Sequence, residues 1–277
     1  MPNKKTAPHL IPSKLVGQRF PRDTFGDTKI ALIAYCPPPR ALGNYNPIAT
    51  GDQYFIHVSP DSVKKLSHNG INFLSLVHVY GGPVSATTVE ELAYYNFDYI
   101  LAYGLAGGLG TKNLKMGDFY RVDTALVADG TTPHYTQEPI VSADASLKTV
   151  ISEHWQRTNP QPIHPVQAIT GDALYREDDT FLDSARAQGC DIVNLDSSHL
   201  YAVSQTNSDN KRLKTIECGV ISDVTGSDPD HDWDSNLSVM LSSENTTALN
   251  PLELTGKIVE FYIEQLAPLL LAQAPAS

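Results

Sequence analysis

The sequence has 277 residues, of which 41% are hydrophobic and 18% are charged, and its formal net charge at pH 7 is -11. This length allows one large α/β domain or two small ones, and the composition is ordinary for a globular protein that buries a core. The excess of acidic residues argues against a nucleic-acid partner, because binding to a phosphate backbone needs clustered Lys and Arg.

The three cysteines lie far apart in the sequence and form no CxxC motif. We expect buried free thiols in a reducing compartment rather than a metal ribbon or a redox pair. Residues 1–12 are polar and contain prolines, unlike a signal peptide, and no apolar run approaches the length that crosses a membrane. The sequence therefore predicts a cytoplasmic protein with no membrane partner.

The first third of the chain combines a polar segment with short apolar runs. Residues 1–28 carry four prolines, and we interpret them as an N-terminal arm. Lys29 to Tyr35 is predicted to be a buried strand that ends at the proline-rich segment 36–40. A second strand is expected at 53–58. A helix is then expected from Ser59, a plausible N-cap followed by proline, to the Asn-Gly pair at 69–70.

The middle of the chain alternates apolar runs with helical patterns. A strand is predicted at 73–79, a helix at 83–95 and a buried strand at 98–103. Further strands are expected at 118–127, 166–170, 192–195 and 215–222, and further helices at 142–155, 177–188, 197–205 and 251–271. This alternation favours an α/β fold with a mixed, mostly parallel central sheet flanked by helices. We found no linker, so residues 29–277 are predicted to form one domain.

Glycines crowd together directly after the strand at 98–103, at positions 104, 107, 108 and 110. Glycine lets a ligand approach the backbone closely, and open α/β sheets bind small molecules at the carboxyl ends of their strands. A second pair, Gly81-Gly82, also follows an apolar run. We expect these two glycine turns to form two walls of one small-molecule pocket; the alternative is a tight corner without a ligand.

No metal site or standard nucleophile motif is evident. The nine histidines form no HExxH motif, and there is no GxSxG or Walker-type loop. Asp230, Asp232 and Asp234 alternate as in a calcium loop, but Ser235 and Leu241 stand where that loop has Gly and Glu. We therefore expect a solvated loop here and no metal.

Three aspartates stand where predicted strands end. Asp172, Asp196 and Asp223 follow the strands at 166–170, 192–195 and 215–222. A carboxylate at the mouth of a parallel sheet is well placed for general acid catalysis if burial raises its pKa. The alternative for each is a helix N-cap. Because no obvious helix follows Asp223, we prefer it as the catalytic candidate.

The order of several motifs resembles the nucleoside phosphorylase and nucleosidase superfamily, from about His9 to Leu266. The motifs are Gly81-Gly-Pro-Val-Ser with Val89-Glu-Glu-Leu92, Gly104-Leu-Ala-Gly-Gly108 with Gly117-Asp118, Asp129-Gly with His134, Asn194-Leu-Asp-Ser197, and Ile221-Ser-Asp223. This resemblance implies a single-domain, three-layer α/β/α fold. It also implies an enzyme of nucleoside metabolism that cleaves an N-glycosidic bond.

The same resemblance implies roles for individual residues. Asp223 would protonate the leaving base, and Asp196 would hold the ribose hydroxyls. His9 on the arm would reach a neighbouring subunit's site, which implies a homo-oligomer (a dimer, trimer or hexamer). The implied substrate site further includes Leu195, Gly104, Leu105, Ala106, Gly107, Leu174, Tyr175 and Arg176.

The phosphate site departs from the pattern of phosphorolytic members. Ala102 stands where they carry Arg, and Leu105 stands where they carry a hydroxyl. Arg40 and Gly82 are the remaining candidate anion ligands. No cofactor is expected, and phosphate stays open as a co-substrate, so hydrolysis and phosphorolysis are both open.

Two other functions are compatible with the sequence. The first is a repurposed member of the superfamily that acts on an apolar, non-nucleoside substrate, with Leu105, Leu174 and Leu195 lining its pocket. The second is a non-catalytic binding or storage protein.

Overall fold

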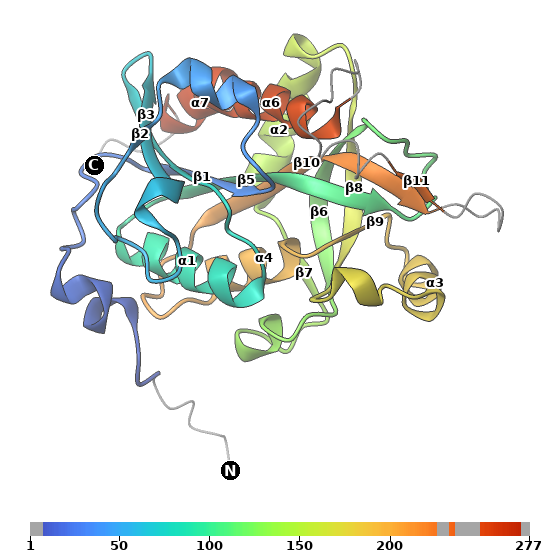
Figure 1. Cartoon of the computed structure of the whole chain (residues 1–277), viewed down its shortest axis with the longest axis horizontal. Coiled ribbons are helices and arrows are strands. Elements are labelled where there is room, and N and C mark those ends of the chain that lie inside the picture. Colours follow the sequence, from blue (N-terminus) through green and yellow to red (C-terminus); the bar gives the residue numbers. More distant parts are fainter. Residues whose placement is uncertain (1–7, 226–232, 236–249, 273–277) are drawn as a thin grey trace.

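The computed structural model describes residues 8–225, 233–235 and 250–272. Within these residues, one mixed sheet of eleven strands forms the centre of the molecule (Figure 1). The strands are β1 (Ile30–Tyr35), β2 (Ile48–Ala49), β3 (Val63–His68), β4 (Ile71–Leu76), β5 (Tyr99–Gly108), β6 (Phe119–Val127), β7 (Ile140–Ser142), β8 (Ile163–Thr170), β9 (Ile192–Asn194), β10 (Lys214–Thr225) and β11 (Trp233–Ser235). The predicted α/β fold class is confirmed.

Part of this sheet closes on itself. Strands β4, β1, β5 and β10 form one group of parallel strands, and β6, β8 and β9 form a second. Antiparallel pairings of β10 with β6 and of β5 with β9 join the two groups. Strands β5, β10, β6, β8 and β9 therefore form a closed ring, and the antiparallel β4–β3–β2 extension continues from β1.

Helices cover both faces of the sheet. They are α1 (Gly82–Tyr94), α2 (Ala145–Thr158), α3 (Asp179–Ala187), α4 (Ser197–Gln205), α6 (Pro251–Glu260) and α7 (Ala267–Ala272), with a π-helical turn at Phe261–Leu266 between the last two. Figure 1 shows α1 and α4 on one side and α2, α6 and α7 on the other. No helix in the described part of the chain is long and apolar enough to cross a bilayer.

The core lies between these layers. All six residues of β1 are buried, because β4 and β5 flank this strand in the sheet and helices cover it. Residues with continuous apolar character suit a strand that is buried on both faces, as the sequence predicted. The arm also contributes: Val16 and Phe25 are buried in the core, and the Phe25 ring packs against Tyr54 and Tyr95.

The helix predicted from Ser59 to residue 70 is wrong. Only a short 3-10 turn follows Ser59, and the chain then forms the hairpin of β3 and β4. Asn69 and Gly70 connect the two strands with φ angles of 49° and 80°. A two-residue Asn-Gly loop with both φ angles positive is the turn that matches the twist of a hairpin, so it outweighs the proline-based helix signal. The strand predicted at 53–58 is also absent; there, the Gln53 amide donates to the carbonyl of Val58 at 2.9 Å.

The glycine stretch after residue 103 is a strand rather than a turn. Gly104 to Gly108 form the second half of β5 and pair with both β10 and β9. The absence of side chains lets neighbouring groups pack directly on the backbone: a Cβ at Gly104 would lie 3.2 Å from the Tyr35 Cβ. The glycines therefore serve close packing at the point where the ring closes.

Candidate active site

Asp223 lies near the end of β10, and its side chain packs against the backbone of β5. A register shift between Ile221 and Asp223 places this aspartate opposite Gly107, where a Cβ would come within 3.2 Å of its Oδ2. The Ser222 hydroxyl donates to its Oδ1 at 2.5 Å. Asp223 is only 5% exposed, and burial raises the pKa of its carboxyl above the usual value. A raised pKa favours the protonated form, which is the form that a general acid needs.

Glu177 is a second carboxyl near Asp223, and the sequence analysis did not identify it. It follows a 3-10 turn at Leu174–Arg176 and is half-buried. Burial, and then the nearby charge of Asp223, raise the pKa of Glu177 to about 7. The sequence indicated only a helix at this position, and that helix begins later, capped by Asp178.

Asp196 stands at the start of α4 but does not cap it. It occupies the N-cap position, yet its side chain accepts no hydrogen bond from the helix N-terminus. Asp172 does not cap a helix either; its Oδ2 accepts from the Gly130 amide at 2.6 Å. The helix-cap interpretation therefore fails for both residues. Asp196 is only 5% exposed, so helix capping does not explain why its carboxyl is buried.

Glu217 of β10 lies against the 194–197 segment that contains Asp196, and sequence reasoning missed it as well. It is fully buried, and a Cβ at Gly104 would lie 3.7 Å from its Oε1. Its Oε2 accepts from the Ser197 hydroxyl at 2.7 Å. Its Oε1 accepts from the Asn194 amide at 3.3 Å and the Tyr120 hydroxyl at 3.4 Å. A Glu within an otherwise apolar run was the only signal in the sequence.

The remaining predicted substrate residues fall into two groups. Leu195, Leu105, Ala106 and Gly107 are buried or half-buried close to the carboxyl pair or to Asp223. Leu174, Tyr175 and Arg176 are exposed, with Tyr175 at 95%. The structure thus brings Gly104, Gly107, Asp196 and Asp223 to one end of the sheet and leaves the 174–176 turn on the surface.

The predicted arm and anion residues lie apart from these carboxyls. His9 is exposed, and its carbonyl accepts from the Lys14 ammonium at 3.0 Å. The Arg40 guanidinium is 85% exposed and pairs with Glu253 at 3.5 Å. Gly82 begins α1, and a Cβ there would collide with the Thr131 hydroxyl.

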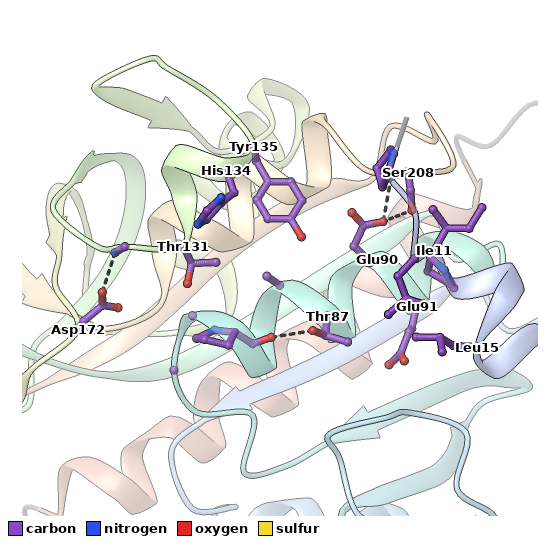
Figure 2. A pocket seen from close by; sticks show the side chains of 18 residues that line it. Ile11, Leu15, Thr87, Glu90, Glu91, Thr131, His134, Tyr135, Asp172 and Ser208 are labelled. Carbon is purple, nitrogen blue, oxygen red and sulfur yellow. Dashed lines mark hydrogen bonds between the residues drawn. The ribbon is translucent and has the colours of Figure 1, made fainter. Parts of the chain in front are cut away.

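A cavity of about 890 Å³ opens between the arm, α1 and the loop at 130–135 (Figure 2). Leu10, Ile11 and Leu15 form its apolar side, and Thr131, His134 and Asp172 lie at the opposite end. Of the predicted site residues, Gly82 lines this cavity. The second glycine wall therefore faces a different space from the one beside Asp223, and the expected single pocket with two glycine walls is not what these elements form.

His199 lies behind this cavity, on α4. It is fully buried, and neither ring nitrogen has a hydrogen-bond partner among the described residues. Its Nδ1 would lie 3.5 Å from a Cβ at Gly82. Burial lowers the pKa of His199 to about 4, although the charges of Asp129 and Asp172 act in the opposite direction.

We expect His199 to make folding sensitive to acid. Because its pKa falls from 6.5 to about 4 on folding, its neutral form contributes stability above pH 6.5 that is lost as the pH falls towards 4. The loss amounts to roughly 3 kcal/mol. Thermal unfolding of the wild type and of His199→Leu across this range should show a steeper decline for the wild type. Parallel declines would contradict the prediction.

Metal ligation finds no support in the described part of the chain, where no group of three or more His, Cys, Asp or Glu side chains could hold an ion. Asp230, Asp232 and Leu241 of the calcium-like pattern lie outside the described residues. All three cysteines are buried free thiols, as predicted.

Comparison with known proteins identifies relatives of two kinds. In sequence, the chain is 29% identical over 252 residues to an uncharacterized protein of Acanthamoeba polyphaga mimivirus, covering 85% of this chain and 95% of that protein. It is 24% identical over 162 residues to a guanosine phosphorylase of Halorubrum lacusprofundi, covering 58% of this chain and 63% of that protein.

Solved structures share the fold at low sequence identity. Purine nucleoside phosphorylase from Toxoplasma gondii, in complex with immucillin-H, superposes with a TM-score of 0.66 at 16% identity, covering 88% of this chain and 92% of that one. The 5'-methylthioadenosine/S-adenosyl homocysteine nucleosidase of Campylobacter jejuni gives 0.61 at 12% identity, covering 85% and 96%. The family model of the phosphorylase superfamily matches residues 61–250. The resemblance seen in the sequence is thus confirmed, and the chain belongs to the phosphorylase superfamily.

Proposed function

We propose that this protein cleaves the N-glycosidic bond of a nucleoside or nucleoside-like compound, with Asp223 as the general acid. The observation that carries the proposal is the position of this carboxyl at the end of β10. It is buried against Gly107 and forms no ion pair within the described residues. Burial favours the protonated form of this carboxyl, and a protonated acid at this position can protonate the departing base.

Asp196 is proposed to bind the sugar. Its carboxyl is nearly buried, is not used as a helix cap, and lies at the same sheet end as Gly104. The absence of side chains at Gly104 and Gly107 lets the carboxyls of Glu217 and Asp223 lie close to the backbone of this strand. The base would then reach Asp223, and Leu195 and Leu105 would supply apolar contacts.

The relatives support this proposal at the level of the reaction class. A guanosine phosphorylase is among them in sequence, and a purine nucleoside phosphorylase and two nucleosidases share the fold. Membership of the phosphorylase superfamily supports an enzyme of nucleoside metabolism.

A homo-oligomer in the cytoplasm is also proposed. Three free cysteines suit a reducing compartment. The described part of the arm carries an exposed apolar side chain, Leu10, at 66% exposure, which a second subunit could cover. Light scattering should show a species larger than the monomer, and His9→Ala should weaken substrate binding if the arm completes a neighbour's site. A monomer would remove that role for His9.

The test of the proposed function is direct. Purified protein is incubated with a panel of purine and pyrimidine nucleosides, with and without phosphate, and free base is separated and measured. Release of base from at least one nucleoside is expected. If every nucleoside stays intact under both conditions, the protein does not catalyse this reaction.

A further inference from the structure

Two buried carboxyl groups, Asp196 and Glu217, lie beside the middle of β5. Glu217 pairs in register with Ala102, and Gly104 lies two residues further along the same face of the strand. Asp196 stands between Asn194 and Ser197, whose side chains both donate to Glu217, at 3.3 and 2.7 Å, and the charge of Glu217 raises the pKa of the Asp196 carboxyl. Both side chains are almost completely removed from solvent, at 5% and 0% exposure. Two such groups cannot both carry a charge in a dry site.

The surrounding donors decide which of the two is ionised. Ser197, Asn194 and Tyr120 all donate hydrogen bonds to Glu217. The Asn194 carbonyl oxygen is engaged by the Thr170 hydroxyl at 3.0 Å, which turns the amide nitrogen towards Glu217. Donors favour the ionised form of an acid. Glu217 is therefore the first of the two to ionise, above its raised pKa of about 7, and Asp196, whose carboxyl lacks these donors and whose pKa is raised well above its usual value, ionises after it.

No positive charge compensates this pair. Neither carboxyl forms an ion pair with any Lys or Arg that the structure describes, and the guanidinium of Arg40 is directed to Glu253. Burial raises the pKa values of the other titratable groups around the pair, which stay neutral: Tyr35, Cys36, Tyr80, Tyr120, Tyr201, Cys218 and Tyr262. Above the pKa of Glu217, the sugar end of the site thus carries an uncompensated negative charge.

A phosphate dianion and a water molecule respond to this charge in opposite ways. Phosphate binding needs positive groups and charge-assisted donors, and here it would meet a buried negative charge instead. Water is neutral and benefits from a nearby carboxylate that accepts its proton. The same charge also favours the positive sugar ring that forms as the glycosidic bond breaks.

We infer that the Asp196–Glu217 pair makes this a hydrolytic site, in which water attacks the sugar and the pair takes up the proton of the water. The inference rests on the proposed cleavage of an N-glycosidic bond. The oxygen of water forms a bond to the anomeric carbon as the carbon–nitrogen bond breaks. The bonding electrons leave with the base, which receives a proton from Asp223. The products are free base and free sugar, and water is the sole co-reactant.

The first test identifies the sugar product. A nucleoside that the protein cleaves is incubated with phosphate from none to a large excess, and the sugar is identified by NMR. Free sugar, released at a rate independent of phosphate, is expected. A sugar 1-phosphate, or a rate that rises with phosphate, overturns the inference and leaves the proposed function standing. The absence of any base release overturns both.

The second test addresses the pair itself. Glu217→Gln should lower the rate of hydrolysis by roughly 10²-fold, because a proton acceptor is lost. The wild-type rate should fall below about pH 7, where burial places the pKa of Glu217, and this limb should disappear in the variant. Glu217→Asp keeps a carboxylate and should retain the limb. It also guards against a variant that simply fails to fold.

A matched control uses another glutamate. Glu264 lies in the π-helical turn between α6 and α7, on the side of the sheet opposite α1 and α4 (Figure 1), and accepts from the Tyr45 hydroxyl at 2.8 Å. Glu264→Gln should keep the wild-type rate and pH profile. Melting curves for all variants separate lost activity from lost structure. A Glu217→Gln protein that melts normally and shows the wild-type rate and pH profile overturns the role of the pair.

Discussion

Asp223→Asn is expected to lower the rate of base release by roughly 10²–10⁴-fold, the contribution of a well-placed general acid. The amide keeps the shape of the carboxyl and can still accept from Ser222, but it has no acidic proton to give to the leaving base. The measurement is the initial rate of base release from the best nucleoside substrate, over a range of pH. The wild type should lose activity as the pH rises past the raised pKa of Asp223, and the variant should lack this limb.

The loss should not come from unfolding. Burial raises the folded-state pKa of Asp223, so the protonated form contributes stability below the unfolded pKa, and that stability is lost as the pH rises through the folded pKa. A neutral asparagine avoids this loss. The variant should therefore melt at the same temperature as the wild type, or higher, at neutral pH.

Asp144→Asn is the matched control, because it makes the same chemical change away from the site. Asp144 caps α2 by accepting from the amides of Ser146 and Leu147, and asparagine caps helices about equally well. Activity and stability should both be kept. An Asp223→Asn protein as active as this control would show that another group, with Glu177 the nearest candidate, protonates the base.

The sequence located the general-acid candidate because its evidence was local. An apolar run that ends in Ser222-Asp223, with no helical pattern after it, could be read without knowing any partner strand. Glu177 and Glu217 carry no such signal. Glu217 matters because β10 lies beside β5 and because Asp196 approaches from α4, and both contacts join segments far apart in the chain.

The same distinction explains the two main errors in the fold. The proline after Ser59 is a local helix signal, but pairing of β3 with β4 through a two-residue turn outweighed it. The glycines after residue 103 looked like a turn because glycine is common in turns. In the closed ring of strands, these glycines pair with the neighbouring strands β10 and β9, so the same residues continue β5 instead of forming a turn. Local composition suggested the right residues and the wrong conformation.

Gly219→Ala should have the largest effect on stability of any single methyl group added to this sheet. Gly219 lies in β10 between Gly104 of β5 and Tyr120 of β6. A Cβ at this position would overlap the Tyr120 ring and would lie 2.5 Å from the Gly104 carbonyl oxygen. Overpacking of a dense core costs about 3 kcal/mol when no side chain can move aside, and the Gly104 carbonyl belongs to the backbone.

The measurement is thermal unfolding, in which we expect the melting temperature to fall by about 10 °C. Gly43→Ala provides the control: Gly43 lies in a 3-10 turn, has no atom within 4 Å of the added carbon, and should be neutral or slightly stabilising. Equal melting temperatures for the two variants would contradict the packing described for the ring.

Gly219→Ala should also affect the candidate active site. Tyr120 is the ring that an added methyl group would displace, and its hydroxyl donates to Glu217. If Gly219→Ala folds at low temperature, Glu217 should lose a donor that favours its charge, so its pKa should rise and the acid limb of activity should move to higher pH. A glycine with no chemistry of its own would then set the charge of the carboxyl pair, because its missing side chain determines where Tyr120 can lie.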